Sequence, residues 1–227
     1  MKINFKYEEN EYLNIHTISV IGEFNGYDSK KGQMIKEGNT WIFGHNLPPG
    51  EHRYKFLING ELKLNDPTAN IYLPDDNEEL WSVIIINDQE ERLYNNTQYT
   101  VHLDKYNISS VAKEEVVANK KRFNIFLDKK VITRFEFTKV TGLHTVTTVW
   151  YTPKMDLFQI TENNLFTPQG EDKPIKMWFW MDLEDKGRQY PCGVWTMKLF
   201  IDGEFILEDQ FTITESSSYS SQGEIKY

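Results

Sequence analysis

The residues 20–28, VIGEFNGYD, and 47–60, LPPGEHRYKFLING, decide the fold of the first part of this chain. At residues 17–20 and 53–56 apolar residues alternate with polar ones, which is the period of two expected of a strand with one buried face and one solvated face. The second stretch ends at Asn59-Gly60, a dipeptide typical of tight hairpin turns because both central residues must accept positive φ. The pattern therefore predicts an antiparallel sheet.

The alternation also predicts which side chains share a face. In the second stretch Tyr54 and Phe56 belong to the buried side. Arg53 and Lys55 fall on the opposite side, because successive side chains of a strand point to opposite faces. We expect this outer face to be partly basic and partly aromatic.

The two stretches resemble the glycogen-binding module family. This family includes the sugar-binding domain of the AMP-activated protein kinase beta subunit and the N-terminal domains of branching and debranching enzymes. Its pattern is a strand ending in G-x-F-N-x-W, followed by L-P-x-G-x-Y-x-Y-K-F-x-x-D-G. The resemblance covers about residues 17–88, less than half of the chain.

The resemblance implies a set of sugar contacts on the outer face. Tyr27 holds the place of the Trp on which a sugar ring stacks, and Lys55 keeps the Lys that points at sugar hydroxyls. Trp41 matches a family position near the sheet surface. The family's last polar contacts lie in the loop before the final strand, where we choose Asn70 without a residue-by-residue alignment. The predicted function is non-catalytic binding of an α-glucan such as glycogen or starch.

One departure from the family pattern supports an alternative function. A second Trp normally follows the D-G turn, and Leu62 occupies its place here. An aromatic contact contributes about 0.5–1.5 kcal/mol beyond burial, so its loss weakens sugar binding up to about tenfold. The loop at residues 75–79 is also acidic. The alternative is therefore a scaffold that keeps the module fold, has a degenerate sugar site, and binds a protein partner or itself.

Composition limits the partners and the location of the chain. It has 227 residues and a net charge of −9, with no dense block of Lys and Arg, so nucleic acid is not an expected partner. No stretch approaches the roughly 18 apolar residues of a membrane span, and the N-terminus lacks a signal-like apolar run. Cys192 is the single cysteine, in agreement with a reducing compartment. We expect a cytoplasmic protein without membrane contact.

Turn signals and alternating runs divide the chain into two parts. Residues 1–94 are expected to form the module-like sandwich, residues 95–215 a second sandwich of no recognised family, and residues 216–227 a disordered tail. The predicted fold is all-β, with two antiparallel immunoglobulin-like β-sandwich domains in tandem. Residues 111–119 are compatible with a short helix or with a strand. Asp202-Gly203 marks a second tight hairpin.

The tryptophans of the second part lie in alternating strands. Trp150 and Trp195 are expected in its core. Trp178 and Trp180 share one strand face, for which we favour the core over a second sugar platform or an interface patch.

No catalytic or metal-binding constellation is apparent in the sequence. The whole chain is shorter than the (β/α)8 barrel of about 250 residues to which the family is usually attached. Adjacent acids such as Glu184-Asp185 cannot flank a glycosidic bond across a cleft. The histidines have neither an i, i+4 partner nor a Cys at metal-ligand spacing. We therefore predict no enzyme activity, no metal and no cofactor.

Overall fold

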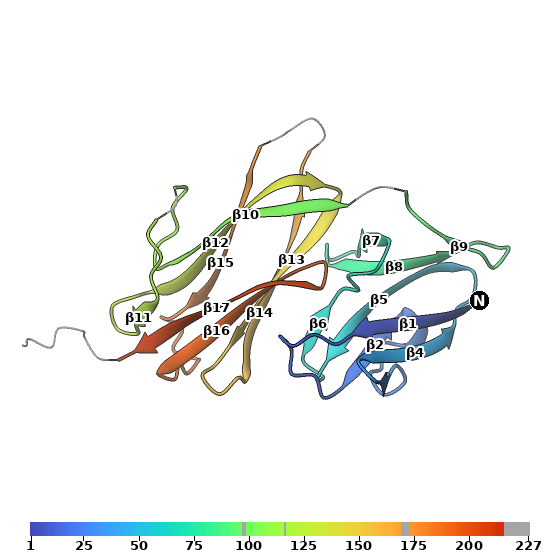
Figure 1. Ribbon diagram of the computed structural model, residues 1–227, viewed down its shortest axis with the longest axis horizontal. Helices are drawn as coiled ribbons and strands as arrows, with labels where there is room; N and C mark the ends of the chain where they lie inside the picture. The colour runs from blue at the N-terminus through green and yellow to red at the C-terminus, as the bar shows by residue number, and fades with distance from the viewer. Residues whose placement is uncertain (97–98, 116, 169–172, 216–227) are drawn as a thin grey trace, which may run out of the picture.

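The computed structural model describes residues 1–96, 99–115, 117–168 and 173–215, and these form almost entirely β structure (Figure 1). The all-β prediction is confirmed, and the sheets are mainly antiparallel; the immunoglobulin-like classification stays a prediction. The strands of the first half are β1 Lys2–Glu8, β2 Ile18–Gly22, β3 Ile35–Glu37, β4 Thr40–Asn46, β5 Gly50–Ile58, β6 Leu62–Leu64, β7 Ile71–Pro74, β8 Leu80–Ile86 and β9 Arg92–Leu93. The strands of the second half are β10 Thr100–Ser109, β11 Arg122–Asn124, β12 Lys130–Thr141, β13 Leu143–Tyr151, β14 Leu157–Phe166, β15 Ile175–Asp182, β16 Gly193–Ile201 and β17 Glu204–Thr214.

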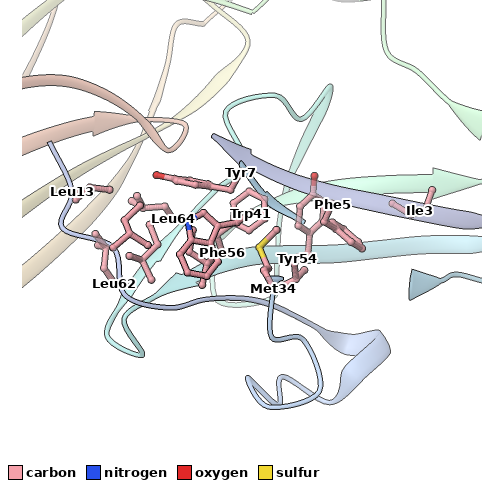
Figure 2. Close-up of a cluster of buried hydrophobic side chains, with 14 of the residues drawn as sticks. Ile3, Phe5, Tyr7, Leu13, Met34, Trp41, Tyr54, Phe56, Leu62 and Leu64 are labelled. Carbon is pink, nitrogen blue, oxygen red and sulfur yellow. The ribbon is translucent and has the colours of Figure 1, made fainter. Parts of the chain in front are cut away.

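The first half stacks two sheets around one apolar core. One sheet has the strand order β1-β4-β3, and the other has the order β2-β5-β8-β7, with β6 on β5 and β9 on β8. Phe5, Trp41, Tyr54 and Phe56 contribute to the core from both sheets (Figure 2). The predicted hairpin is present, because Asn59 and Gly60 have φ of 52° and 75°.

The second half also has two sheets, of orders β10-β12-β15 and β11-β17-β16-β13-β14. β11 pairs parallel to β17, whereas the other pairings are antiparallel. Trp150 and Trp195 are fully buried in the core of this half, as predicted. The Asp202-Gly203 hairpin is also present, with φ of 53° and 88°.

Within the five-stranded sheet of the second half, β13 and β16 are buried on both faces. One face packs on the sheet β10-β12-β15, and the other meets the N-terminal half, so the sheet lies between them (Figure 1). Val149 of β13 and Phe200 of β16 belong to the core cluster of the N-terminal half. β13 accordingly shows a continuous buried run in place of the alternation that a one-sided strand would show. The two halves therefore share a common apolar core region.

Two sequence predictions differ from the structure. The described part of residues 111–119 contains no helix. Trp178 and Trp180 lie on the outer side of β15, and Trp180 is 50% exposed, because Phe179 and Met181 supply the apolar side chains that face the core. The core prediction for this pair is therefore wrong. The predicted disordered tail lies outside the described residues.

The described residues include one short 3-10 helix, Glu23–Asn25. None of their helices is long and apolar enough to cross a membrane.

Candidate functional site

The loop that carries Tyr27 is fixed by the buried side chain of Asn25. The Asn25 Nδ2 donates to the Val20 carbonyl at 2.8 Å, and its Oδ1 accepts from the Gly22 N–H at 3.1 Å. These bonds close the 3-10 turn, which ends at Gly26 in the left-handed region. Tyr27 follows with a φ of 58° and a side chain 48% exposed. The F-N dipeptide thus positions an aromatic ring at the surface.

Trp81 packs against the Tyr27 ring. The ring centroids of Tyr27 and Trp81 are 5.7 Å apart in an edge-to-face arrangement. The Trp81 Nε1 donates to Asp75 Oδ2 at 3.1 Å, so the indole is held in place. The other neighbour of the indole is Lys55, whose Nζ lies 5.3 Å from the ring centroid. Tyr27, Trp81 and Lys55 therefore form a continuous row on the outer face of the β2-β5-β8-β7 sheet.

Lys55 is covered by the second half of the protein. Its side chain is 1% exposed, and its Nζ donates at 2.9 Å to Glu79 and at 2.9 Å to Glu162 of β14. Glu162 also accepts from the Thr147 hydroxyl at 3.4 Å. The ammonium group thus joins the loop before β8 to the β13–β14 hairpin.

The electrostatics of this triad follow from its burial. Desolvation raises the pKa of Glu162, and the charge and hydrogen bonds of Lys55 oppose that rise. At the rim, burial likewise opposes ionisation of Asp75, but hydrogen bonds from Asn77 N–H, the Trp81 indole and Glu79 N–H lower its pKa overall. A buried lysine held between two carboxylates is satisfied within the protein and is not free to bond a sugar hydroxyl.

Trp41 lies on the opposite side of this sheet, in the core. It is 7% exposed, and its ring packs among the core side chains labelled in Figure 2. Its Nε1 has no hydrogen-bond partner among the described residues. Trp41 is therefore a core residue and shares no surface with Tyr27.

Asn70 and Leu62 also have internal contacts. The Asn70 Nδ2 donates to the Asn95 carbonyl at 2.9 Å, and its Oδ1 accepts from the Asn95 N–H, so Asn70 tethers the connection between the halves. Leu62, at the second platform position, is 4% exposed and belongs to the cluster that includes Val149 and Phe200. An aliphatic side chain at this position suits a packed interface.

The expected solvent-facing patch of Tyr27, Trp41 and Lys55 is therefore not formed. Only Tyr27 of the three has an exposed ring, and any sugar contact by these residues stays a prediction. The sequence analysis missed Trp81 and Glu162. Trp81 shares the outer face of the sheet with Lys55, but it lies in the apolar run of β8, where no alternation shows which side chains face outward. Glu162 gives no local signal either, since its contact with Lys55 spans 107 positions.

No other chemistry is evident at the site. The part of the chain that the structure describes has no group of three or more His, Cys, Asp or Glu placed to hold a metal ion.

Comparison with known proteins gives distant structural likenesses. No curated protein matches the chain. A beta-glucosidase from Listeria innocua, in complex with glucose, is 6% identical with a TM-score of 0.33, over 55% of this chain and 16% of that one. A maltogenic amylase from S. marinus is 14% identical with a TM-score of 0.31, over 94% of this chain and 28% of that one. A DUF3823 family protein from Bacteroides ovatus is 10% identical with a TM-score of 0.27, over 95% of this chain and 100% of that one.

The chain spans 16% of the length of the first of these structures. Likenesses this distant carry no argument about activity. The informative match is to a family model described as the glycogen recognition site of AMP-activated protein kinase, and it covers residues 4–92. These residues include both sheets of the N-terminal half, apart from the first two residues of β1 and the last residue of β9. The match of residues 4–92 therefore supports a glycogen-binding carbohydrate module in the N-terminal half, as the sequence resemblance predicts.

Proposed function

We propose that this protein binds an α-glucan of the glycogen or starch type without acting on it. The observation that carries the proposal is the match of residues 4–92 to a glycogen recognition model. The exposed Tyr27 ring, backed by Trp81, supports it, because aromatic faces stack on the apolar faces of pyranose rings.

The non-catalytic part of the proposal rests on the two acids that bond Lys55. Glycoside hydrolysis needs one carboxylic acid to donate a proton and a second, free carboxylate to act as nucleophile or base. Glu79 and Glu162 instead both bond the Lys55 ammonium at 2.9 Å. This arrangement supports a structural role for the two acids.

Titration of the full chain with maltoheptaose and with glycogen tests this function. Trp81 lies beneath Tyr27, so a bound sugar should change the tryptophan fluorescence or the amide shifts of the Tyr27 loop. The same sugar incubated with the protein should yield no shorter products. A few contacts correspond to a dissociation constant of about 1 mM at the weakest. If neither the fluorescence nor the amide shifts change up to 10 times that sugar concentration, the proposal is excluded.

A second candidate function follows from the cover over Lys55. The outer face of the module contacts the second half of the same chain at Lys55. This contact supports a scaffold function in which the sugar site has been lost. Phe126 and Leu127 form an adjacent apolar pair, 76% and 73% exposed, on a turn of the second half. In this version the pair binds a second copy of the chain.

Sedimentation of the protein across a concentration series distinguishes the two candidates. The scaffold function predicts self-association that Phe126→Ser with Leu127→Ser abolishes. Ile35→Ser, at another exposed apolar residue that is 70% exposed, is the matched control. A strictly monomeric protein that binds glucan would exclude this version.

A further inference from the structure

A groove of about 730 Å³ lies beside the covered lysine, between the two halves. One wall is the turn between β7 and β8, with Asn77, Glu78 and Glu79. The other wall is the β13–β14 hairpin, with Glu162, Asn163 and Phe166. The groove thus exists only where the N-terminal module and the second half are in contact.

The walls of this groove are held in place by hydrogen bonds. The Asn164 Nδ2 donates across the groove to the Glu78 carbonyl at 2.7 Å. Within the turn, Asp75 Oδ1 accepts from the N–H groups of Asn77 at 2.8 Å and Glu79 at 3.0 Å. The Lys55 triad fixes the Glu79 and Glu162 carboxylates at the floor. The groove is therefore largely preformed, which reduces the entropy lost on binding.

The side chains at the groove suit a sugar. Phe166 is 58% exposed and offers an aromatic face at the end of β14. The side-chain amide of Asn77 has no hydrogen-bond partner among the described residues, and it offers one acceptor and two donors. Sugar hydroxyls both donate and accept, so amides and carboxylates can bond them in pairs. A concave site with one aromatic face and a few polar groups has the makeup of a small-molecule site.

Charge selects among sugars. Three carboxylates, those of Glu78, Glu79 and Glu162, line the groove, and Lys55 neutralises only part of their charge. The protein as a whole also has a net charge of −9. A phosphorylated sugar or a uronic acid would therefore be repelled, whereas a neutral sugar would not.

We infer that this groove between the halves binds a neutral oligosaccharide, with Phe166 stacking on a sugar ring and Asn77 bonding its hydroxyls. The inference rests on the proposed glucan function, and moves the binding site away from the covered face of Lys55. It also assigns a role in binding to the second half of the chain. One aromatic face and a few hydrogen bonds correspond to a dissociation constant on the order of 0.1–1 mM.

The test is a titration of the full chain with maltoheptaose, followed by amide shifts. Phe166→Ala should weaken binding about fivefold or more, since an aromatic contact is lost. Asn77→Ala should weaken it by a smaller factor. Ile35→Ala is the control, because Ile35 is an exposed apolar residue outside the groove, and it should leave the titration unchanged. Tyr27→Ala tests the module surface as the rival site.

The outcomes separate this inference from the proposed function. If maltoheptaose binds and Phe166→Ala has no effect while Tyr27→Ala abolishes binding, the groove is excluded and the glucan function stands. If the unchanged protein binds no maltoheptaose at 10 times the expected weak limit of about 1 mM, both are excluded. Binding of maltose 1-phosphate as tight as that of maltose would overturn the charge argument.

Discussion

The burial of Lys55 shows how tertiary context redefines a single residue. Its strand alternation places it opposite the module core, and the structure agrees. Its 1% exposure comes from the second half of the chain, which no local pattern predicts. A lysine suited to sugar hydroxyls is here the centre of an ion triad.

Replacing this lysine should destabilise the protein strongly. Lys55→Met leaves the mostly buried Glu162 carboxylate without its countercharge, at a cost of about 3 kcal/mol in the free energy of unfolding. Adding Glu162→Gln should recover part of the loss, because the unpaired charge is then gone. Chemical denaturation measures both variants. Lys63→Met, at an exposed lysine of β6, is the control, and equal effects at both lysines would contradict the ion-triad account.

His144 is the second residue whose environment fixes its chemistry. Its Nδ1 lies 2.6 Å from Asp202 Oδ2, and its Nε2 lies 3.0 Å and 3.1 Å from the carbonyl oxygens of Thr141 and Thr100. All three neighbours only accept hydrogen bonds, so both ring nitrogens carry protons. Burial alone lowers the pKa of His144, but the hydrogen bond and charge of Asp202 outweigh it and raise the pKa above 6.5.

The raised pKa of His144 predicts a loss of stability at alkaline pH. Its contribution is present in full below the unfolded pKa of 6.5 and disappears as the pH rises through the higher folded value. The difference in melting temperature between the wild type and His144→Gln should therefore shrink between about pH 6 and pH 9. A difference that stays constant over this range would exclude a charged histidine.

At the scale of elements, the two hairpins show what a sequence can predict. Asn59-Gly60 and Asp202-Gly203 both adopt positive φ, because the dipeptides themselves require the tight turn. The surroundings of the turns are not encoded locally. A Cβ on Gly203 would lie 1.9 Å from the Asn65 carbonyl oxygen, whereas a Cβ on Gly60 would meet nothing within 4 Å.

This difference makes the two glycines a matched pair. Gly60→Ala should cost about 1–2 kcal/mol, the penalty of a left-handed backbone for a residue with a Cβ. Gly203→Ala should cost at least about 2 kcal/mol more, because the methyl group also collides with backbone of the N-terminal half. Unfolding free energies of the two variants measure the difference. Equal losses would show that the hairpin can shift away from Asn65 at no cost.

Strand faces were predictable from period two, whereas the choice of buried face was not. The alternation put Trp178 and Trp180 on one side of β15 and Phe179 and Met181 on the other. Either side is apolar enough for a core, and tertiary packing selected the phenylalanine side. The same limit applies to the site. The exposure of Tyr27 could be predicted from its turn. The burial of Trp41 and of Lys55 could not, because it depends on which sheet packs on which face.

At the scale of the whole molecule, the central feature is the pair of strands β13 and β16, which are buried on both faces. Val149 and Phe200 of the second half complete the core of the first, and the rings of Tyr12 and Phe205 stack at 3.9 Å between the halves. Such a shared core couples the stability of the two halves.

We therefore expect the chain to unfold in one cooperative transition. Phe200→Ala should cost about 3–5 kcal/mol and lower the stability of both halves together, because its cavity opens at their interface. Fluorescence of Trp41 and Trp81 reports on the first half, and that of Trp150 and Trp195 on the second, when the others are replaced by Phe. Two separate midpoints would contradict a shared core.

The cover over Lys55 has a consequence for competition. Because the β13–β14 hairpin belongs to the same polypeptide, dilution cannot remove it, and its local concentration near the lysine is fixed by the tether at about the millimolar level or above. A free ligand that binds Lys55 would have to displace this hairpin at every protein concentration. The fraction of this face that is bound would then depend more on how often the two halves separate than on the ligand concentration.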